Sequence, residues 1–321
     1  MPSRRLARFA WAVLGWNLLV VLWGAYVRAS GSGAGCGAHW PLCNGVVVPR
    51  APELATLIEF THRLTSGVAG LLVLGLAAWA WRITRPGAAL RRAALASLVF
   101  MVTEALLGAA LVKFELVASD DSLTRAFSLG AHLVNTFLLL AALAVTGWLA
   151  AGGAAPRPAL APRRARAIGL LLAGVLLVGV TGAITALGDT LFPATSVAEG
   201  LRQDLSPTSH LLLRLRVWHP ALALAVGAGV IALPALLGPG VGLAAGRLAR
   251  GAAALVGVQW LVGAVNIVLL APTALQLVHL LLADLVWIAL VLAGCAALAA
   301  APAVEPAAPR EPAAAAALAG R

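Results

Sequence analysis

The chain has 321 residues, of which 61% are hydrophobic and only 11% are charged. Soluble domains carry roughly a quarter charged residues. This chain has too few polar residues to cover a core of that size, so lipid must surround most of it. The net charge of +11 comes almost entirely from arginines clustered between apolar runs. Topology signals lie at such places, and this placement argues against a nucleic-acid partner.

Eight apolar runs are long enough to cross a membrane, because a transmembrane helix needs about 20 residues. The first run exceeds the roughly 7–15 residues of a signal-peptide core, so we expect it to be an uncleaved span. The sequence therefore predicts an all-α integral membrane protein with eight transmembrane helices. The runs are 9–27, 64–81, 93–112, 129–150, 167–188, 217–237, 251–271 and 275–301.

The arginines also predict the orientation. With the N-terminus in the cytoplasm, 15 of the 23 basic residues fall on the cytoplasmic side. Short cytoplasmic loops carry such an excess of Lys and Arg. We expect a multi-pass protein of the bacterial cytoplasmic membrane with both termini inside. Residues 302–321 are rich in Ala and Pro and are expected to form a disordered cytoplasmic tail.

The sequence repeats itself over the four spans of each half. Matched glycines and histidines are separated by 147 to 158 residues. Since four spans return the chain to the same side, the copies form a parallel repeat of two pseudo-symmetric four-helix bundles. We predict an N-terminal bundle at 1–150, a cytoplasmic linker at 151–166 and a C-terminal bundle at 167–301. The matched pairs are Gly24 with Gly182, Gly108 with Gly263, His62 with His219, and His132 with His279.

The four repeated histidines are predicted in the first turns of helices that enter from the outside. Ionisable residues at membrane depth are costly and usually face the bundle interior. Neutral imidazole is a suitable axial ligand for haem iron. Zinc prefers four close ligands, so two separated pairs fit two haem sites better. The other two histidines, His39 and His210, are expected to be solvated loop residues.

The two halves differ in their acidic residues. Glu59 lies three residues before His62, so a helix would place both on one face. Its repeat equivalent is Arg216, and the carboxylate belongs to one half only. A structural role, in a salt bridge to Arg63 or at the positive end of a helix, explains Glu59 equally well. Glu104 and Asp284 are candidates for proton transfer or a propionate network, or are simply paired interior residues.

Four arginines and two cysteines lie near the predicted histidine level. Bidentate arginine suits the carboxylates of haem propionates, although snorkelling at a helix end explains any one of them. Cys36 and Cys43 share a glycine-rich outer loop, where an oxidising environment allows a disulfide. That bridge could be structural or redox-active. The candidate propionate contacts are Arg28, Arg63, Arg214 and Arg216.

Three motifs together resemble the haem A synthase family. They are Gly24–Arg28 (GAYVR), Cys36–Gly45 (with HWPLCNG after the first cysteine) and Glu59–Arg63 (EFTHR). His132, His219 and His279 follow at the family's places. The resemblance covers the chain except its tail. It implies oxidation of the C8 methyl group of haem O to a formyl group, by successive hydroxylations, to make haem A for terminal oxidases.

The resemblance also implies a role for each site residue. His219 and His279 would hold a haem b cofactor, His62 and His132 would receive haem O, and Glu59 would be catalytic. Cys36 and Cys43 match the cysteine pair of many bacterial members. Haem O synthase and an unidentified electron donor are the implied protein partners. The alternative, a di-haem b-type membrane electron-transfer protein, fits the four histidines alone equally well.

One position departs from the family pattern. Pro220 follows His219, where the family commonly has an arginine. Proline is tolerated in the first turn of a helix, so we expect His219 to remain a ligand. Arg214 or Arg216 is the expected replacement for the missing propionate contact.

Overall fold

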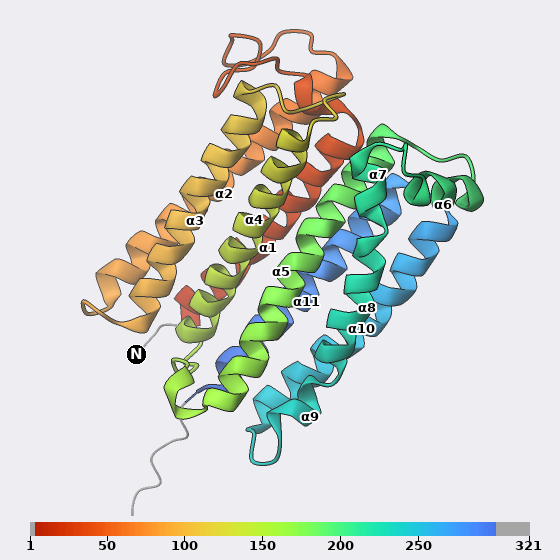
Figure 1. Ribbon diagram of the computed structural model, residues 1–321. Helices are drawn as coiled ribbons and strands as arrows, with labels where there is room; N and C mark the ends of the chain where they lie inside the picture. The colour runs from red at the N-terminus through yellow and green to blue at the C-terminus, as the bar shows by residue number, and fades with distance from the viewer. Residues whose placement is uncertain (1–3, 300–321) are drawn as a thin grey trace, which may run out of the picture.

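A computed structural model describes residues 4–299, and the tail predicted at 302–321 lies outside them. The described residues form helices and no strand, and eight helical segments are long and apolar enough to span a membrane, as predicted (Figure 1). These are α1 (Arg4–Ala29), α2 (Leu54–Ile83), α3 (Ala89–Lys113), α4 (Leu123–Ala150), α5 (Pro162–Leu191), α7 and α8 together (Leu211–Arg216 and Trp218–Ile231), α10 (Leu243–Val268) and α11 (Thr273–Ala297).

Shorter helices lie in the connections. Two of them, α6 (Val197–Leu205) and α9 (Leu233–Leu237), are α-helical, and η1 (Ser32–Ala34) and η2 (Pro158–Leu160) are 3₁₀ turns. The connection between the two halves covers only residues 151–161, because α5 begins at Pro162. Proline is favoured in the first turn of a helix, where its missing N–H costs no hydrogen bond.

The spanning helices begin before the apolar runs do. Their first turns carry polar residues and project beyond the apolar stretch that the sequence marks. Each of the four repeated histidines therefore lies six to nine residues after the start of its span, about 9–14 Å along the helix axis. The histidines are thus deeper than the first-turn position predicted from the apolar runs.

Proline explains the interruption of the sixth span. Pro220 has no N–H and its ring clashes with the carbonyl four residues earlier, at Arg216. The chain accordingly leaves the helix at Val217 and starts α8 at Trp218. Pro220 thus lies in a first helical turn, as expected. The same effect of Pro234 separates α8 from α9 at Ala232.

The eight spans form two sets of four with the same order of neighbours. In the first set, α1 contacts α2 and α4, and α3 closes the ring; in the second, α5 contacts α8 and α11, and α10 closes the ring. Figure 1 shows α2 and α3 at one edge and α8 and α10 at the other. A symmetry axis relating the two sets remains a prediction.

The two sets pack against each other through α4 and α11, the most buried spans. Trp287 of α11 stacks on Phe137 of α4 with ring centroids 5.2 Å apart, and its Nε1 donates a hydrogen bond to the Phe137 carbonyl. Arg28 of α1 adds a polar contact near the end of the interface. It donates to the Ala186 carbonyl and Thr190 Oγ1 of α5 (2.8 Å each) and to Gln276 Oε1 of α11 (3.1 Å).

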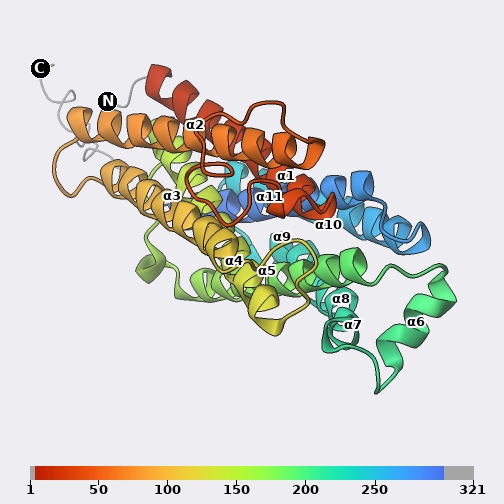
Figure 2. The ribbon, with the colours of Figure 1, turned by 90° about the horizontal axis from the view of Figure 1, so that it is seen from above.

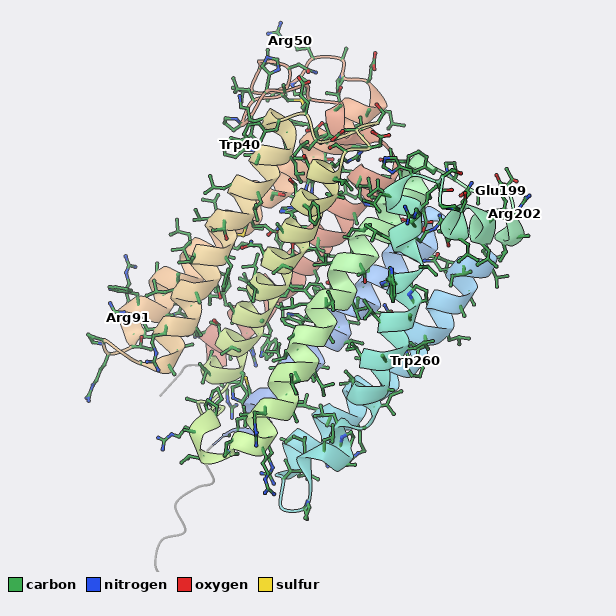
Figure 3. The ribbon with its side chains drawn as sticks, viewed as in Figure 1. Trp40, Arg50, Arg91, Glu199, Arg202 and Trp260 are labelled. Atoms are coloured by element: carbon green, nitrogen blue, oxygen red, sulfur yellow. A yellow bond between two sulfur atoms is a disulfide. The ribbon has the colours of Figure 1, made fainter. Side chains whose placement is uncertain are left out.

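The two ends of the bundle differ in chemistry. The loop with Trp40 and Arg50 lies at the same end as α6, while Arg91 lies at the opposite end (Figure 3). Figure 2 shows α6 outside the bundle, beside α7. The first end therefore carries the long loops that were predicted outside, and the second carries the short arginine-rich connections. Which end faces the cytoplasm remains a prediction.

Candidate functional site

Each of the four repeated histidines lies against a glycine of the preceding span. A Cβ built on Gly24, Gly182 or Gly263 would lie only 2.9, 2.9 or 3.1 Å from Cε1 of His62, His219 or His279, respectively. Real Cβ atoms rarely approach that closely, so these three positions require glycine while the imidazoles keep their places. Gly108 lies against His132 in the same way with more room, at 3.9 Å. The repeat glycines of the sequence are thus the surfaces on which the histidines rest.

Three of these imidazoles have a buried nitrogen without a hydrogen-bond partner among residues 4–299. The unpartnered atoms are Nδ1 of His62, His132 and His279. Buried polar atoms in proteins are nearly always hydrogen-bonded. Rings that are fixed in position but incompletely bonded suit a bound group that supplies the missing interactions.

The two rings of the second-half pair lie close together. The rings of His219 and His279 have centroids 6.3 Å apart and planes at 79°. Nδ1 of His219 lies 3.2 Å from the Val178 carbonyl oxygen. A carbonyl only accepts, so this contact places the hydrogen on Nδ1 and leaves Nε2 free for a ligand. Thr181 Oγ1 is 3.3 Å from the same nitrogen.

The separation of this pair leaves room for one metal ion between the two rings. Metal–imidazole bonds are about 2.0–2.1 Å long, as for zinc, and the ring centroids are 6.3 Å apart. No group of three or more His, Cys, Asp and Glu side chains that could hold a metal ion occurs in the described part of the chain. The donor set therefore fits a haem with two axial ligands better than a zinc site.

In the first half, a glutamate–arginine ion pair fastens a disulfide-closed loop to the helix that carries His62. Glu59 is 3% exposed; its Oε2 accepts from the Cys36 N–H at 2.8 Å, and its Oε1 pairs with Arg63. Arg63 also donates to the carbonyls of His39 and Leu42. Glu59 is helical, as expected, and the predicted salt bridge to Arg63 is present. Together the two side chains fasten the loop to the start of α2.

The loop itself is closed by a disulfide between Cys36 and Cys43, as predicted. His39 lies between the two cysteines and is exposed. Gly35 packs so tightly on the α2 backbone that an added Cβ would lie 2.5 Å from Ala55. The disulfide, Glu59 and Arg63 therefore hold this loop against the end of the first-half bundle.

Glu104 lies beside His132, with its Oε2 3.7 Å from the histidine Nδ1. It accepts hydrogen bonds from Asn135 Nδ2 at 2.6 Å and from Thr136 Oγ1. Sequence reasoning missed both of these partners. The spacing of three and four residues from His132 was the signal, since such residues share a helix face.

Asp284 has a different environment. It is fully buried in α11, and neither carboxylate oxygen has a hydrogen-bond partner in the described residues. It is one turn of helix before Trp287, at the contact between the two halves. No hydrogen bond or ion pair joins Asp284 to any of the four repeated histidines within residues 4–299.

The four candidate arginines have different partners. Arg28 binds groups of α5 and α11, and Arg63 binds Glu59 and the loop. Arg216 forms ion pairs with Asp189 at 2.6 Å and Asp204 at 2.6 Å. Arg214 is exposed and forms no ion pair within the described part of the chain. Arg214 is therefore the one of the four with its guanidinium free for an anion.

His210 is separate from the ligand set. It begins α7 by accepting a hydrogen bond from the Leu212 N–H at its Nδ1 (3.3 Å), and its ring stacks on Phe192. Nearby on α6, the hydrogen bonds that Thr195 donates to the exposed Glu199 hold the pKa of that carboxyl below its usual value. These contacts order the long connection before α7.

The fold and the histidines packed on glycines define a multi-pass helical membrane protein with two pairs of candidate haem ligands. A family model described as COX15-CtaA, cytochrome oxidase assembly protein, matches residues 7–291. The chain belongs to this family.

Similar proteins agree with that assignment. A protein named protoheme IX farnesyltransferase from Thermus thermophilus is 51% identical over 304 residues, which are 92% of this chain and 48% of that protein. A heme A synthase from Alkalihalophilus pseudofirmus is 39% identical over 127 residues, covering 40% of this chain and 42% of the relative. One from Bacillus cereus is 48% identical over 95 residues, 30% of each chain. The chain spans half or less of the length of these relatives.

Proposed function

We propose that this protein is a haem A synthase, which oxidises the C8 methyl group of haem O to a formyl group by successive hydroxylations. One observation carries the proposal. Two histidine pairs occupy equivalent glycine-lined places, but the buried carboxylate Glu59 at a disulfide-closed loop occurs at the start of the first pair, where the second half has Arg216. The relatives named heme A synthase support the same activity. The product would serve terminal oxidases, in keeping with the family description.

The two halves would divide the work. His219 and His279 would hold a resident haem b, because their rings are already at a separation that suits one metal between them. His62 and His132 would receive haem O beside Glu59. When bound, the haem b would supply electron transfer to the reaction. Arg214 would contact a haem propionate. It would replace the arginine that the family commonly has at the position of Pro220.

Conversion of a methyl to a formyl group removes protons as well as electrons from the carbon. Glu59 is a buried carboxylate close in sequence to the proposed haem O ligand, three residues before His62. Its role would be to accept a proton at Oε2, the atom that now accepts from the Cys36 N–H. Arg63 would keep the carboxylate in place through Oε1. Positioned general bases contribute roughly 10²–10⁴-fold to rate.

The haem O source is a proposed partner. The Thermus thermophilus relative is named for farnesyl transfer to protohaem, and this chain covers only 48% of it. One chain there includes both a region similar to this protein and a further region of about equal length. We therefore place this protein next to a haem O synthase in the bacterial cytoplasmic membrane. Its termini would lie inside and the disulfide loop outside, following the arginine distribution.

Co-expression tests the function. The protein is produced with a haem O source in a host that makes no haem A, and the pigments are extracted and separated by chromatography. Haem A well above the vector control is expected. The absence of haem A, with two haems per protein and both low-spin, would contradict the enzyme and favour a di-haem electron-transfer protein.

A further inference from the structure

Gly108 and Gly263 are the equivalent glycines that contact His132 and His279. The residue one helical turn before this glycine differs between the two halves. In the first half it is Glu104, four residues before Gly108; in the second it is Gln259, four residues before Gly263. Both face the histidine of the next span. Glu104 Oε2 lies 3.7 Å from His132 Nδ1. Gln259 Nε2 lies 3.2 Å from His279 Nε2 and donates to the His279 carbonyl at 3.1 Å.

The carboxylate of Glu104 is held by a polar cluster. Asn135 Nδ2 binds Oε2, and Thr136 Oγ1 binds Oε1. Asn135 is fixed in turn by Thr103 Oγ1 at 2.6 Å and by the Phe100 carbonyl at 2.9 Å. Both carboxylate oxygens therefore have defined directions, and Oε2 stays next to the imidazole.

The second half lacks this cluster. At the register of Gln259 and His279, the positions of Thr103, Asn135 and Thr136 are occupied by Val258, Leu282 and Ala283. Glu104 and all three of its supporting residues are thus replaced together by an amide and three apolar side chains. A carboxylate paired with a polar cluster in one half alone indicates a function specific to that half.

The two side chains would act differently on an iron-bound histidine. A carboxylate only accepts hydrogen bonds. When it accepts from the ring N–H of a metal-bound histidine, it fixes the tautomer and the ring orientation and makes the ligand a stronger donor. The amide nitrogen of Gln259 can only donate, so it approaches the other ring nitrogen, Nε2 of His279, and leaves Nδ1 of that histidine without an acceptor in the described part of the chain. Stronger donation stabilises the oxidised iron and lowers its reduction potential.

We propose that Glu104 is the positioning residue of His132, accepting its Nδ1–H so that Nε2 faces the iron of haem O. The inference rests on the proposed function, because it requires the first half to receive a haem. The inference predicts that the two irons differ in the strength of one ligand. His132 would be a stronger donor to the first-half haem than His279 is to the resident haem. Among the described residues Nδ1 of His132 has no hydrogen-bond partner, and Glu104 Oε2, 3.7 Å away, is the acceptor placed to take its hydrogen when the ring binds iron.

The test measures binding and potential without turnover. Purified protein containing its resident haem is titrated with haem O under argon, and both haems are followed by spectroelectrochemistry. We expect Glu104→Gln to bind haem O roughly 10–100-fold more weakly, as for other residues that support metal ligands. It should also raise the potential of haem O and leave the resident haem unchanged. Glu115→Gln, an exposed acid at the end of the same helix, should behave as wild type.

Two further variants keep the inference testable if Glu104→Gln fails to fold. Thr136→Val keeps the carboxylate but removes one of its hydrogen bonds, and should shift the potential in the same direction by less. Gln259→Ala removes the second-half side chain, which contacts Nε2 of His279, and should leave the affinity and potential of haem O unchanged. A wild-type protein that takes up no haem O would contradict the proposed function. Uptake by the wild type, with unchanged affinity and potential in Glu104→Gln, would overturn this inference alone.

Discussion

The two histidine pairs share their scaffold and differ in their surroundings. Both pairs rest on glycines of the preceding span, at repeat-equivalent positions. Around the first pair lie two acids, Glu59 and Glu104, each with fixed hydrogen-bond partners. Around the second pair lie a backbone carbonyl, a threonine and a glutamine. The first set therefore includes carboxylates that could accept protons, whereas these three groups around the second pair are uncharged.

Under the proposed division of labour, this difference has a simple reason. Either role would need an imidazole in a fixed position, which accounts for the glycine–histidine contact in both halves. A resident cofactor would need stable ligation, while a substrate would have to be bound, altered and released, which accounts for acids in the first half. The proposed chemistry of each half would then be set by neighbours one helical turn from the candidate ligands.

The largest expected effect is on turnover. Glu59→Gln keeps the side-chain shape but removes the proton acceptor, and should lower haem A formation by roughly 10²–10⁴-fold. The resident haem should stay at the wild-type level, since Glu59 lies in the other half. Haem A and haem b are measured in the same pigment extract. The matched control is Glu53→Gln, an exposed acid at the start of α2, which should convert haem O normally.

A smaller effect is expected from adding a methyl group to a glycine that contacts a histidine in the second half. Gly182→Ala places a Cβ 2.9 Å from the His219 ring, and overpacking of this kind costs about 1–3 kcal/mol. Purified protein should therefore contain less haem b. Gly169→Ala lies on the same helix with open space around it and should retain full occupancy. Equal haem contents in the two variants would show that the glycine–histidine contact does not matter.

The smallest effects concern the arginines near the second pair. Arg216→Gln breaks the ion pairs with Asp189 and Asp204. A charged hydrogen-bonded contact is worth about 1.5–3 kcal/mol, so the Tm should fall while haem b is retained. Arg214→Gln should leave the Tm unchanged and weaken haem b retention slightly. Thermal unfolding and haem loss to apomyoglobin measure the two quantities, and the opposite pattern would assign the propionate to Arg216.

Much of this arrangement could be predicted from the sequence. Apolar runs give the eight spans, because hydrocarbon demands them, and repeat spacing gives the matched glycines and histidines. The Cys36–Cys43 disulfide also follows from its loop. These features depend on short segments, so local patterns are sufficient to predict them.

Other features depend on contacts between distant helices. Arg28 was predicted to meet a propionate, but in the structure it binds Gln276, 248 residues away. The support of Glu104 by Asn135 depends on how α3 packs against α4, which neither helix alone specifies. Helix starts were missed because polar first turns interrupt the apolar pattern. Sequence patterns therefore located the candidate ligands but not most of the residues that contact them.

The most direct test of the divided roles compares the haems of two single variants. His62→Ala and His219→Ala are each co-expressed with a haem O source, purified, and analysed for haem b, haem O and haem A. The account predicts that His62→Ala keeps haem b and makes no haem A, whereas His219→Ala loses haem b. Equal loss of haem b from both variants, or its loss from His62→Ala alone, would contradict the division between the halves.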